Sequence, residues 1–248
     1  MESYMNRISN TGIVPVVKIL EKEDAYPLAK ALLNGGIDVI EVTYRSEHAT
    51  SAIQTISEQL PDMLVGAGTV LSVEQAKEAV EAGAKFIITP GFNTKVVQWC
   101  LDHDVEVYPG VSTASEVEMA LSMGLTQLKF FPAESSGGAK KLKDLSAPYA
   151  NVHFMPTGGI NTKNMHDYLS LPNVEAIGGS FMLPNDLVVA KDWDGIEALS
   201  KAAIKSLLDF QLIHVGINTN SPEESKQVTD TLCSLFHFTQ YTKPKSNF

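Results

Sequence analysis

A single lysine, Lys129, lies inside an apolar run near the middle of the chain, residues 128–133. Lysine is almost never fully buried unless it is paired or used for chemistry. Desolvation disfavours the ammonium form and lowers the pKa of the amine, which makes an amine nucleophilic near neutral pH. We therefore hypothesise that Lys129 forms a Schiff base with a 2-oxo acid. The alternative is a rim lysine that lays its stem on apolar surface and keeps its head in water.

A glutamate, Glu41, interrupts another apolar run, residues 37–43, which is predicted to be a strand. A carboxylate inside such a strand is costly unless it has a partner, and we expect Glu41 to meet Lys129. The chemical interpretation is a general acid and base that moves protons on the substrate. The alternative is a structural ion pair, although a buried pair is weak evidence for stability.

Three residues that follow predicted strand ends could hold a small acid. Arg45 shares a face with Glu41, because side chains two apart in a strand point the same way, and its planar fork suits a carboxylate. Thr69 offers a hydroxyl after two glycines that let a ligand approach the backbone. Pro90 could line a pocket for a methyl group. The alternatives are a surface arginine, a tight turn and a proline that only ends its strand.

A repeating pattern of predicted strands must position these residues. Apolar, β-branched runs recur about every 20 to 25 residues, and helical spacing fills most of the segments between them. The runs begin near Ile13, Asp38, Met63, Lys85, Val105, Gln127, Val152 and Val174. Eight strand–helix units in about 200 residues predict an α/β fold, a (β/α)8 TIM barrel over residues 1–208. An open doubly wound sheet is the alternative, but no G-x-G-x-x-G motif follows the first run.

Two glycine pairs follow the seventh and eighth predicted strands. They are Gly158-Gly159 and Gly178-Gly179, and Ser180 comes directly after the second pair. In barrel enzymes the chemistry lies at the C-terminal ends of the strands, and these two loops often hold phosphate through backbone N–H groups. We therefore expect a phosphate site here. The alternative is a pair of ordinary tight turns.

Composition narrows the classes of partner. The 248 residues carry a net charge of −10 and no long basic run, so nucleic acid and anionic membranes are poor candidates. Local donors would have to hold an anionic substrate. The 2 cysteines and 6 scattered histidines fit no metal-ligand spacing. We therefore expect the protein to use no metal and no other cofactor. The polar residues 1–10 and the lack of a long apolar run predict a soluble, cytoplasmic protein.

The motifs together resemble those of the bacterial 2-keto-3-deoxy-6-phosphogluconate (KDPG) and 4-hydroxy-2-oxoglutarate (KHG) aldolase family. The resemblance covers roughly residues 12–208. It rests, in this order, on Glu41-Val42-Thr43-Tyr44-Arg45, Gly66-Ala67-Gly68-Thr69-Val70, Pro90-Gly91, Lys129-Phe130-Phe131-Pro132-Ala133-Glu134, Pro156-Thr157-Gly158-Gly159-Ile160 and Gly178-Gly179-Ser180. It implies a class I aldolase, a lyase without a cofactor, on a barrel that is usually a homotrimer.

The resemblance also implies a role for each residue of the site. Lys129 would form the Schiff base and Glu41 would be the acid and base. The other implied substrate-binding residues are Arg45 and Thr69 for the pyruvate carboxylate, Pro90 and Phe131 for the pocket wall, Thr157 for the hydroxyl end, and Gly158, Gly159, Gly179 and Ser180 for the phosphate. The implied products are pyruvate with glyceraldehyde 3-phosphate or glyoxylate, which would place the reaction in the Entner–Doudoroff pathway of carbohydrate metabolism.

Residues 209–248 fall outside that resemblance. They read as a strand (210–218), a helix (222–235) and a further strand (236–241), similar to the opening βαβ unit of a glyoxalase-like (vicinal oxygen chelate) domain. His214 stands where that second family often has a metal ligand. About 40 residues rarely hold a core unaided. We therefore expect this short α+β extension to dock on the barrel or a neighbouring subunit, or to be poorly ordered.

Two other classes of function stay open at this point. A non-catalytic sugar-phosphate-binding barrel would keep the glycine pairs but would not need Lys129 opposite Glu41. A metal-dependent barrel enzyme would lose activity with a chelator. Lys18, at the end of the first predicted strand, is the rival amine, but the charged residues 21–24 that follow it predict a solvated rim.

Overall fold

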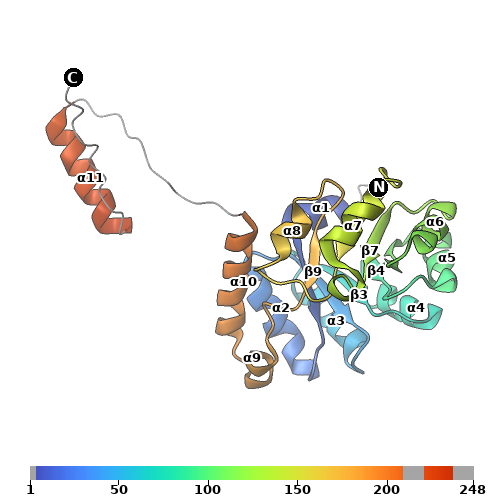
Figure 1. Ribbon diagram of the computed structural model, residues 1–248. Coiled ribbons are helices and arrows are strands. Elements are labelled where there is room, and N and C mark those ends of the chain that lie inside the picture. Colours follow the sequence, from blue (N-terminus) through green and yellow to red (C-terminus); the bar gives the residue numbers. More distant parts are fainter. Residues whose placement is uncertain (1–3, 209–220, 237–248) are drawn as a thin grey trace. The chain divides into compact units, whose positions relative to one another are not determined.

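The structure is a computed structural model that describes residues 4–208 and 221–236. The chain divides into two compact units, Met1–Asp209 and Phe210–Phe248. The first unit is an α/β fold, and its parallel strands form a curled sheet with helices around it (Figure 1).

The strands of the first unit all pair in parallel. They are β1 (Ile13–Val17), β2 (Val39–Thr43), β3 (Leu64–Gly68), β4 (Phe86–Ile88), β5 (Glu106–Tyr108), β6 (Gly110–Val111), β7 (Gln127–Phe130), β8 (His153–Pro156) and β9 (Ile177–Gly179). Hydrogen bonds join one set in the order β5-β4-β3-β2-β1-β9 and a second set in the order β6-β7-β8. Strand β1 therefore pairs with both β2 and β9. This order differs from that of an open doubly wound sheet, in which the strand order reverses.

Two joins link the two sets of strands. Pro109 alone separates β5 from β6, because proline lacks the N–H that a continuous strand donates. Single bridges between Phe154 and Val174 and between Thr157 and Gly178 connect the β8 and β9 segments. The sequence predicts a final strand from Val174, but β9 begins at Ile177, because Val174 makes only an isolated bridge.

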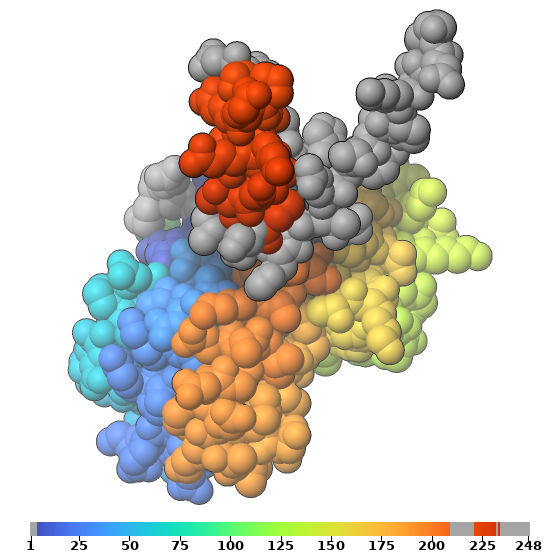
Figure 2. Space-filling view, turned by 90° about the vertical axis from the view of Figure 1, so that its left-hand side faces the viewer, coloured from blue at the N-terminus to red at the C-terminus, as the bar shows by residue number. Residues whose placement is uncertain are grey.

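Helices follow most of the strands. They are α1 (Tyr4–Thr11), α2 (Ala25–Asn34), α3 (Ala49–Gln59), α4 (Val73–Glu81), α5 (Thr94–Asp102), α6 (Ala114–Ser122), α7 (Gly138–Ser146), α8 (Met165–Leu169), α9 (Asn185–Ala190) and α10 (Trp193–Leu208), with 3-10 turns η1 (Lys22–Asp24) and η2 (Glu134–Ser136). The spacing of apolar residues does not predict α7 or α9. Helix α7 has one buried residue, Leu142, and the short α9 has one, Val188. Helices α2 and α10 pack against each other, and Figure 2 shows them on one face.

Two hydrophobic clusters lie on opposite sides of the curled sheet. The larger contains Ile40 and Phe130 together with the buried faces of the surrounding helices. The smaller contains Val39 and Met155 together with Ile8 of α1. Because successive side chains of a strand point to opposite faces, the smaller cluster marks the inner face of the sheet, and α1 closes it at the N-terminal ends of the strands.

The second unit contains helix α11 (Pro222–Phe236), which confirms the helix predicted over residues 222–235. The two predicted strands of this extension and His214 lie outside the described residues. Among the described helices of both units, none combines the length and the apolar character that crossing a membrane requires.

A glycine in β3 tests how tightly the inner face is packed. A Cβ at Gly66 would lie 2.0 Å from Cε2 of the buried Phe86 ring, whereas a Cβ at Gly91 would have no heavy atom within 4 Å. We expect Gly66→Ala to lower the free energy of unfolding in urea by about 1 to 3 kcal/mol, the usual cost of overpacking. Gly91→Ala is the control and should leave it within about 0.5 kcal/mol. Equal stabilities of the two variants would contradict this packing.

Candidate active site

The site is built around an amine and a carboxylate on the inner face of the sheet. Leu128 and Phe130 of β7 belong to the outer cluster, so Lys129 between them points inward. On β2 the same alternation turns Glu41 inward beside Val39. Lys129 Nζ lies 3.2 Å from Glu41 Oε1 and 3.3 Å from Oε2. The structure therefore brings together the two groups that the sequence singles out.

Water has almost no access to this pair. Lys129 is 4% exposed and Glu41 is 0% exposed. The backbone makes room for the carboxylate, because a Cβ at Gly68 would lie 2.0 Å from Glu41 Oε1. The ring of Phe131 lies beside the amine, with its centroid 5.3 Å from Nζ. An amine held next to a carboxylate in a dry interior can act as a nucleophile with a proton carrier in reach.

Arg45 is oriented by Thr43, a buried threonine two residues earlier in the chain. The Thr43 hydroxyl donates to the Val17 carbonyl over 2.7 Å, and it accepts from Arg45 Nε over 3.2 Å. A hydroxyl has one proton, so its bond to Val17 leaves only lone pairs for the arginine. Thr43 is 0% exposed whereas Arg45 is exposed. Among the described residues the guanidinium has no other hydrogen-bond partner, so its remaining N–H groups can bind an anion at the strand ends.

A cavity of about 190 Å³ opens beside Arg45 at the ends of β1, β2 and β9. Its polar lining includes Lys18, Arg45, Ser180 and Asn185. Lys18 is exposed, as expected for a solvated rim, and it nevertheless faces the same cavity as Arg45. The sequence offers one signal for this role, since Lys18 follows a strand end as Arg45 does. Asn185 belongs to α9, which the sequence does not predict.

Thr69 and Pro90 lie at the ends of β3 and β4. Thr69 has a left-handed backbone with φ of 55°, a conformation that is uncommon for a residue with a side chain and that clusters at functional sites. Pro90 lines a surface groove together with Leu71 and Phe92. The backbone of Pro90 lies close to Gly110, since a Cβ there would be 2.3 Å from the Pro90 carbonyl oxygen, and Gly110 is the residue that pairs with Lys129.

The loops after β8 and β9 meet at the buried hydroxyl of Thr157. Thr157 is 4% exposed, and its Oγ1 has no hydrogen-bond partner among the described residues. A Cβ at Gly178 would lie 2.2 Å from this oxygen, so the glycine admits the threonine. Gly158 and Gly159 have φ of 106° and 81°, which favours glycine at both positions. Gly179 is buried at the end of β9, and Ser180 is exposed beside it.

The described residues contain no group of three or more histidine, cysteine, aspartate or glutamate side chains arranged to hold a metal ion. Of the two cysteines, Cys100 is buried in α5, and this burial raises the pKa of its thiol to about 12. Such a thiol is inert as a nucleophile near neutral pH.

Comparison with known proteins gives the chain a family. A family model described as KDPG and KHG aldolase matches residues 4–199. The 2-dehydro-3-deoxy-phosphogluconate aldolase of Treponema pallidum (strain Nichols) is 44% identical over 205 residues, which cover 83% of this chain and 98% of that protein.

Two solved structures extend the comparison to the fold. The KDPG aldolase from Legionella pneumophila, solved with pyruvate captured at low pH as a covalent carbinolamine intermediate, is 40% identical with a TM-score of 0.79. The match covers 82% of this chain and 99% of that one. The KDPG aldolase of Zymomonas mobilis ZM4, solved with 3-phosphoglycerate, is 36% identical with a TM-score of 0.74, and the match covers 80% and 94%.

The buried pair can be tested through stability alone. Glu41→Gln keeps the shape of the side chain but removes the charged group that faces Lys129 in the dry interior, so we expect a loss of about 3 kcal/mol in the free energy of unfolding. The double variant Glu41→Gln/Lys129→Met removes both charges and should recover most of that loss, because a buried pair contributes little net stability. Urea titrations of the three proteins measure this. A double variant less stable than Glu41→Gln would contradict it.

Proposed function

The chain belongs to the KDPG and KHG aldolase family, and we propose that this class I aldolase forms its Schiff base through the Lys129 amine. The single observation that carries the proposal is the contact between Lys129 Nζ and Glu41, a pair excluded from water on the inner face of the sheet. The substrates are 2-oxo acids with a hydroxyl at C4, namely KDPG and KHG. Cleavage gives pyruvate together with glyceraldehyde 3-phosphate or glyoxylate.

The reaction begins at the C2 carbonyl of the substrate. Lys129 Nζ attacks C2 and forms a carbinolamine, whose hydroxyl leaves as water to give the iminium. Glu41 then takes the proton of the C4 hydroxyl, directly or through a water molecule. The C3–C4 bond breaks, the aldehyde leaves, and the electron pair moves into the iminium to form an enamine. Glu41 helps to return a proton to C3, and water hydrolyses the new iminium to release pyruvate and free Lys129.

The carboxylate end of the substrate lies toward Arg45 and Thr69 in this proposal. Arg45 is supported by its fixed Nε bond to Thr43, which leaves its outer N–H groups for a bidentate contact. Phe131 is supported as a wall by its position beside the Lys129 amine. Pro90 is supported by its closeness to Gly110, the residue that pairs with Lys129. We keep it as a wall for the pyruvate methyl.

The phosphate end lies toward the loops after β8 and β9. We assign Gly158, Gly159, Gly179 and Ser180 to the phosphate. We assign the Thr157 hydroxyl, which has no partner within residues 4–208 and 221–236, to a hydroxyl of the substrate. Lys18 adds a positive charge, since it lines the cavity that also contains Ser180. A chain with a net charge of −10 needs such local donors to attract a phosphate dianion. The relative solved with 3-phosphoglycerate supports this choice of ligand.

Several further assignments belong to the proposal. We infer that the strands close into a complete (β/α)8 barrel over residues 1–208, supported by the pairing of β1 with β9 and by the bridges between the β8 and β9 segments. We also infer a homotrimer in the cytoplasm, on family resemblance. Residues 209–248 are interpreted as a separate extension and the start of a glyoxalase-like domain, supported by their sequence pattern and by α11.

A non-catalytic sugar-phosphate binder would need the glycine loops but no amine opposite an acid. A buried ion pair costs desolvation on both sides, so its retention at this place favours catalysis over binding alone. The same argument separates Lys129 from Lys18, because Lys18 is exposed and solvated. Lysine nucleophiles are activated by desolvation in a dry pocket, and an exposed side chain lacks such a pocket.

Trapping with borohydride tests the nucleophile. Incubation with pyruvate and sodium borohydride should add the mass of one reduced pyruvate to the peptide that contains Lys129, as read by mass spectrometry. Lys129→Ala should abolish both the adduct and the cleavage of KDPG, because Lys129 is the one buried lysine among the described residues. Lys18→Ala is the control and should keep the adduct. An adduct on Lys18, or turnover that survives Lys129→Ala, would overturn the proposal.

Replacing Thr43 tests the orientation of Arg45. Thr43→Val keeps the shape of the side chain but removes the acceptor for Arg45 Nε, so we expect KM for KDPG and for KHG to rise about tenfold, the effect of one misaligned charged hydrogen bond. Thr43→Ser restores the hydroxyl and should return both values to near those of the unmodified protein. Steady-state kinetics on both substrates measure this. Unchanged KM values in Thr43→Val would show that Thr43 does not position Arg45.

A further inference from the structure

The loop after β7 is tied to the loop that carries Gly158 and Gly159. The Ala133 N–H donates to the Thr157 carbonyl over 2.8 Å, and the Glu134 N–H donates to the Gly158 carbonyl over 3.1 Å. In the opposite direction, the Thr157 N–H donates to the Phe130 carbonyl over 2.9 Å. Backbone hydrogen bonds therefore join the strand that carries the nucleophile directly to the loop proposed to hold phosphate.

The side chain of Glu134 fills the space that Gly159 leaves open. A Cβ at Gly159 would lie 2.7 Å from Cγ and 2.8 Å from Cβ of Glu134. On its other side, the Gly159 carbonyl accepts a hydrogen bond from Asn164 Nδ2 over 3.2 Å. Gly159 is thus held between the stem of Glu134 and the amide of Asn164, in a left-handed conformation with φ of 81°.

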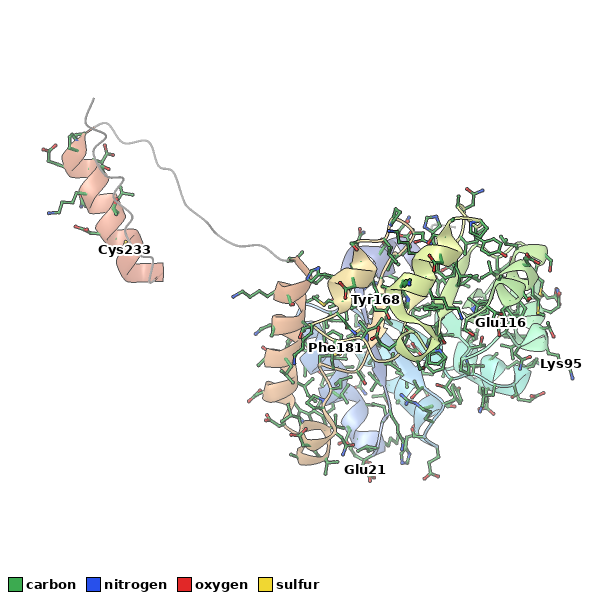
Figure 3. All side chains as sticks on the ribbon, viewed as in Figure 1. Glu21, Lys95, Glu116, Tyr168, Phe181 and Cys233 are labelled. Atoms are coloured by element: carbon green, nitrogen blue, oxygen red, sulfur yellow. The ribbon has the colours of Figure 1, made fainter. Side chains whose placement is uncertain are left out.

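A buried tyrosine fixes the Glu134 side chain. Tyr168 belongs to α8, is labelled in Figure 3, and is 1% exposed. Its hydroxyl donates a hydrogen bond to Glu134 Oε1. Burial, together with this bond to a carboxylate, raises the pKa of Tyr168, so the hydroxyl stays protonated and remains a donor. The helix that follows the glycine loop is thereby connected back to the loop through Glu134.

The sign of the charge indicates what Glu134 contributes. A carboxylate next to a phosphate dianion repels it, and at close range this costs affinity. Glu134 therefore does not bind the phosphate. Its hydrogen bond to Tyr168 draws the carboxylate toward α8, while its stem sets the position of Gly159. Freed from Tyr168, the same side chain would release the loop and could turn its charge toward the ligand.

We propose that Glu134 and Tyr168 are positioning residues that fix the Gly158-Gly159 loop and so set the preference of this aldolase for phosphorylated over unphosphorylated substrates. This inference rests on the proposed function, because it needs Gly158 and Gly159 to contact the phosphate. KHG lacks that group, so its cleavage does not depend on the exact place of the loop. In contrast, the affinity for KDPG and for inorganic phosphate depends on the exact place of the loop.

Steady-state kinetics on two substrates test the proposal. In Tyr168→Phe, which removes one hydroxyl from an otherwise unchanged ring, KM for KDPG should rise about tenfold, with kcat and the kinetics on KHG within about twofold. The inhibition constant of inorganic phosphate against KDPG should rise in parallel. Glu134→Gln keeps an acceptor for Tyr168 and should stay near the unmodified protein, whereas Glu134→Ala should follow Tyr168→Phe.

The chain supplies a matched control. The Tyr149 hydroxyl also donates to a glutamate, Glu118 Oε1, over 3.0 Å, so Tyr149→Phe removes the same kind of bond elsewhere and should leave both substrates unaffected. Equal losses on KDPG and KHG in Tyr168→Phe, or an unchanged KM for KDPG, would overturn the inference. Failure of the proposed function looks different: the unmodified protein would then cleave neither substrate and would form no borohydride adduct with pyruvate.

Discussion

The structure depends on keeping one amine and one carboxylate together in a place that water does not reach. Lys129 and Glu41 come from strands that are not neighbours in the sheet, and they meet only because the sheet curls. Each charge would be costly alone in this setting. Gly68 makes space for the carboxylate, and the cluster around Val39 and Met155 fills the inner face below the pair. The packing of the inner face thus serves a reactive pair whose own contribution to stability is small.

The two ends of the proposed substrate are held by different physical means. At the carboxylate end, a side chain with a full charge, Arg45, is aimed by a buried hydroxyl from its own strand. At the phosphate end, the backbone of two glycines is shaped by neighbours from β7 and α8. A charged side chain tolerates small shifts, because its attraction falls off slowly with distance. Backbone N–H donors do not tolerate such shifts, because a hydrogen bond weakens steeply when its geometry changes. The glycine loop therefore needs a separate support.

Much of this arrangement could be predicted from the sequence. Alternation along a strand predicted a shared face for Glu41 and Arg45. The apolar neighbours of Lys129 left a buried and a rim lysine open, and the structure has it buried. The recurring runs predicted the starts of most strands to within a residue or two. The curled sheet follows from that repeat once β1 is seen to pair with both β2 and β9.

The remainder depends on contacts that spacing does not reveal. Lys18 reads as a rim residue because charged residues follow it, and the direct pairing of β1 with β2 brings it to the cavity of Arg45. Helix α7 opens on glycines, and its apolar stripe is only Ala139, Leu142 and Leu145, of which Leu142 alone is fully buried, so the stripe is too short to set the segment apart from a loop. The link between Glu134 and Tyr168 joins residues 34 positions apart on separate elements, and neither residue alone departs from an ordinary surface or core pattern.

A crystal structure of the protein soaked with pyruvate would test the central claim most directly. The account predicts continuous density between Lys129 Nζ and C2 of pyruvate, with the carboxylate against Arg45 and Glu41 within hydrogen-bond distance of the adduct. Pyruvate joined to Lys18 instead, or Lys129 still paired with Glu41 and unmodified at saturating pyruvate, would contradict it.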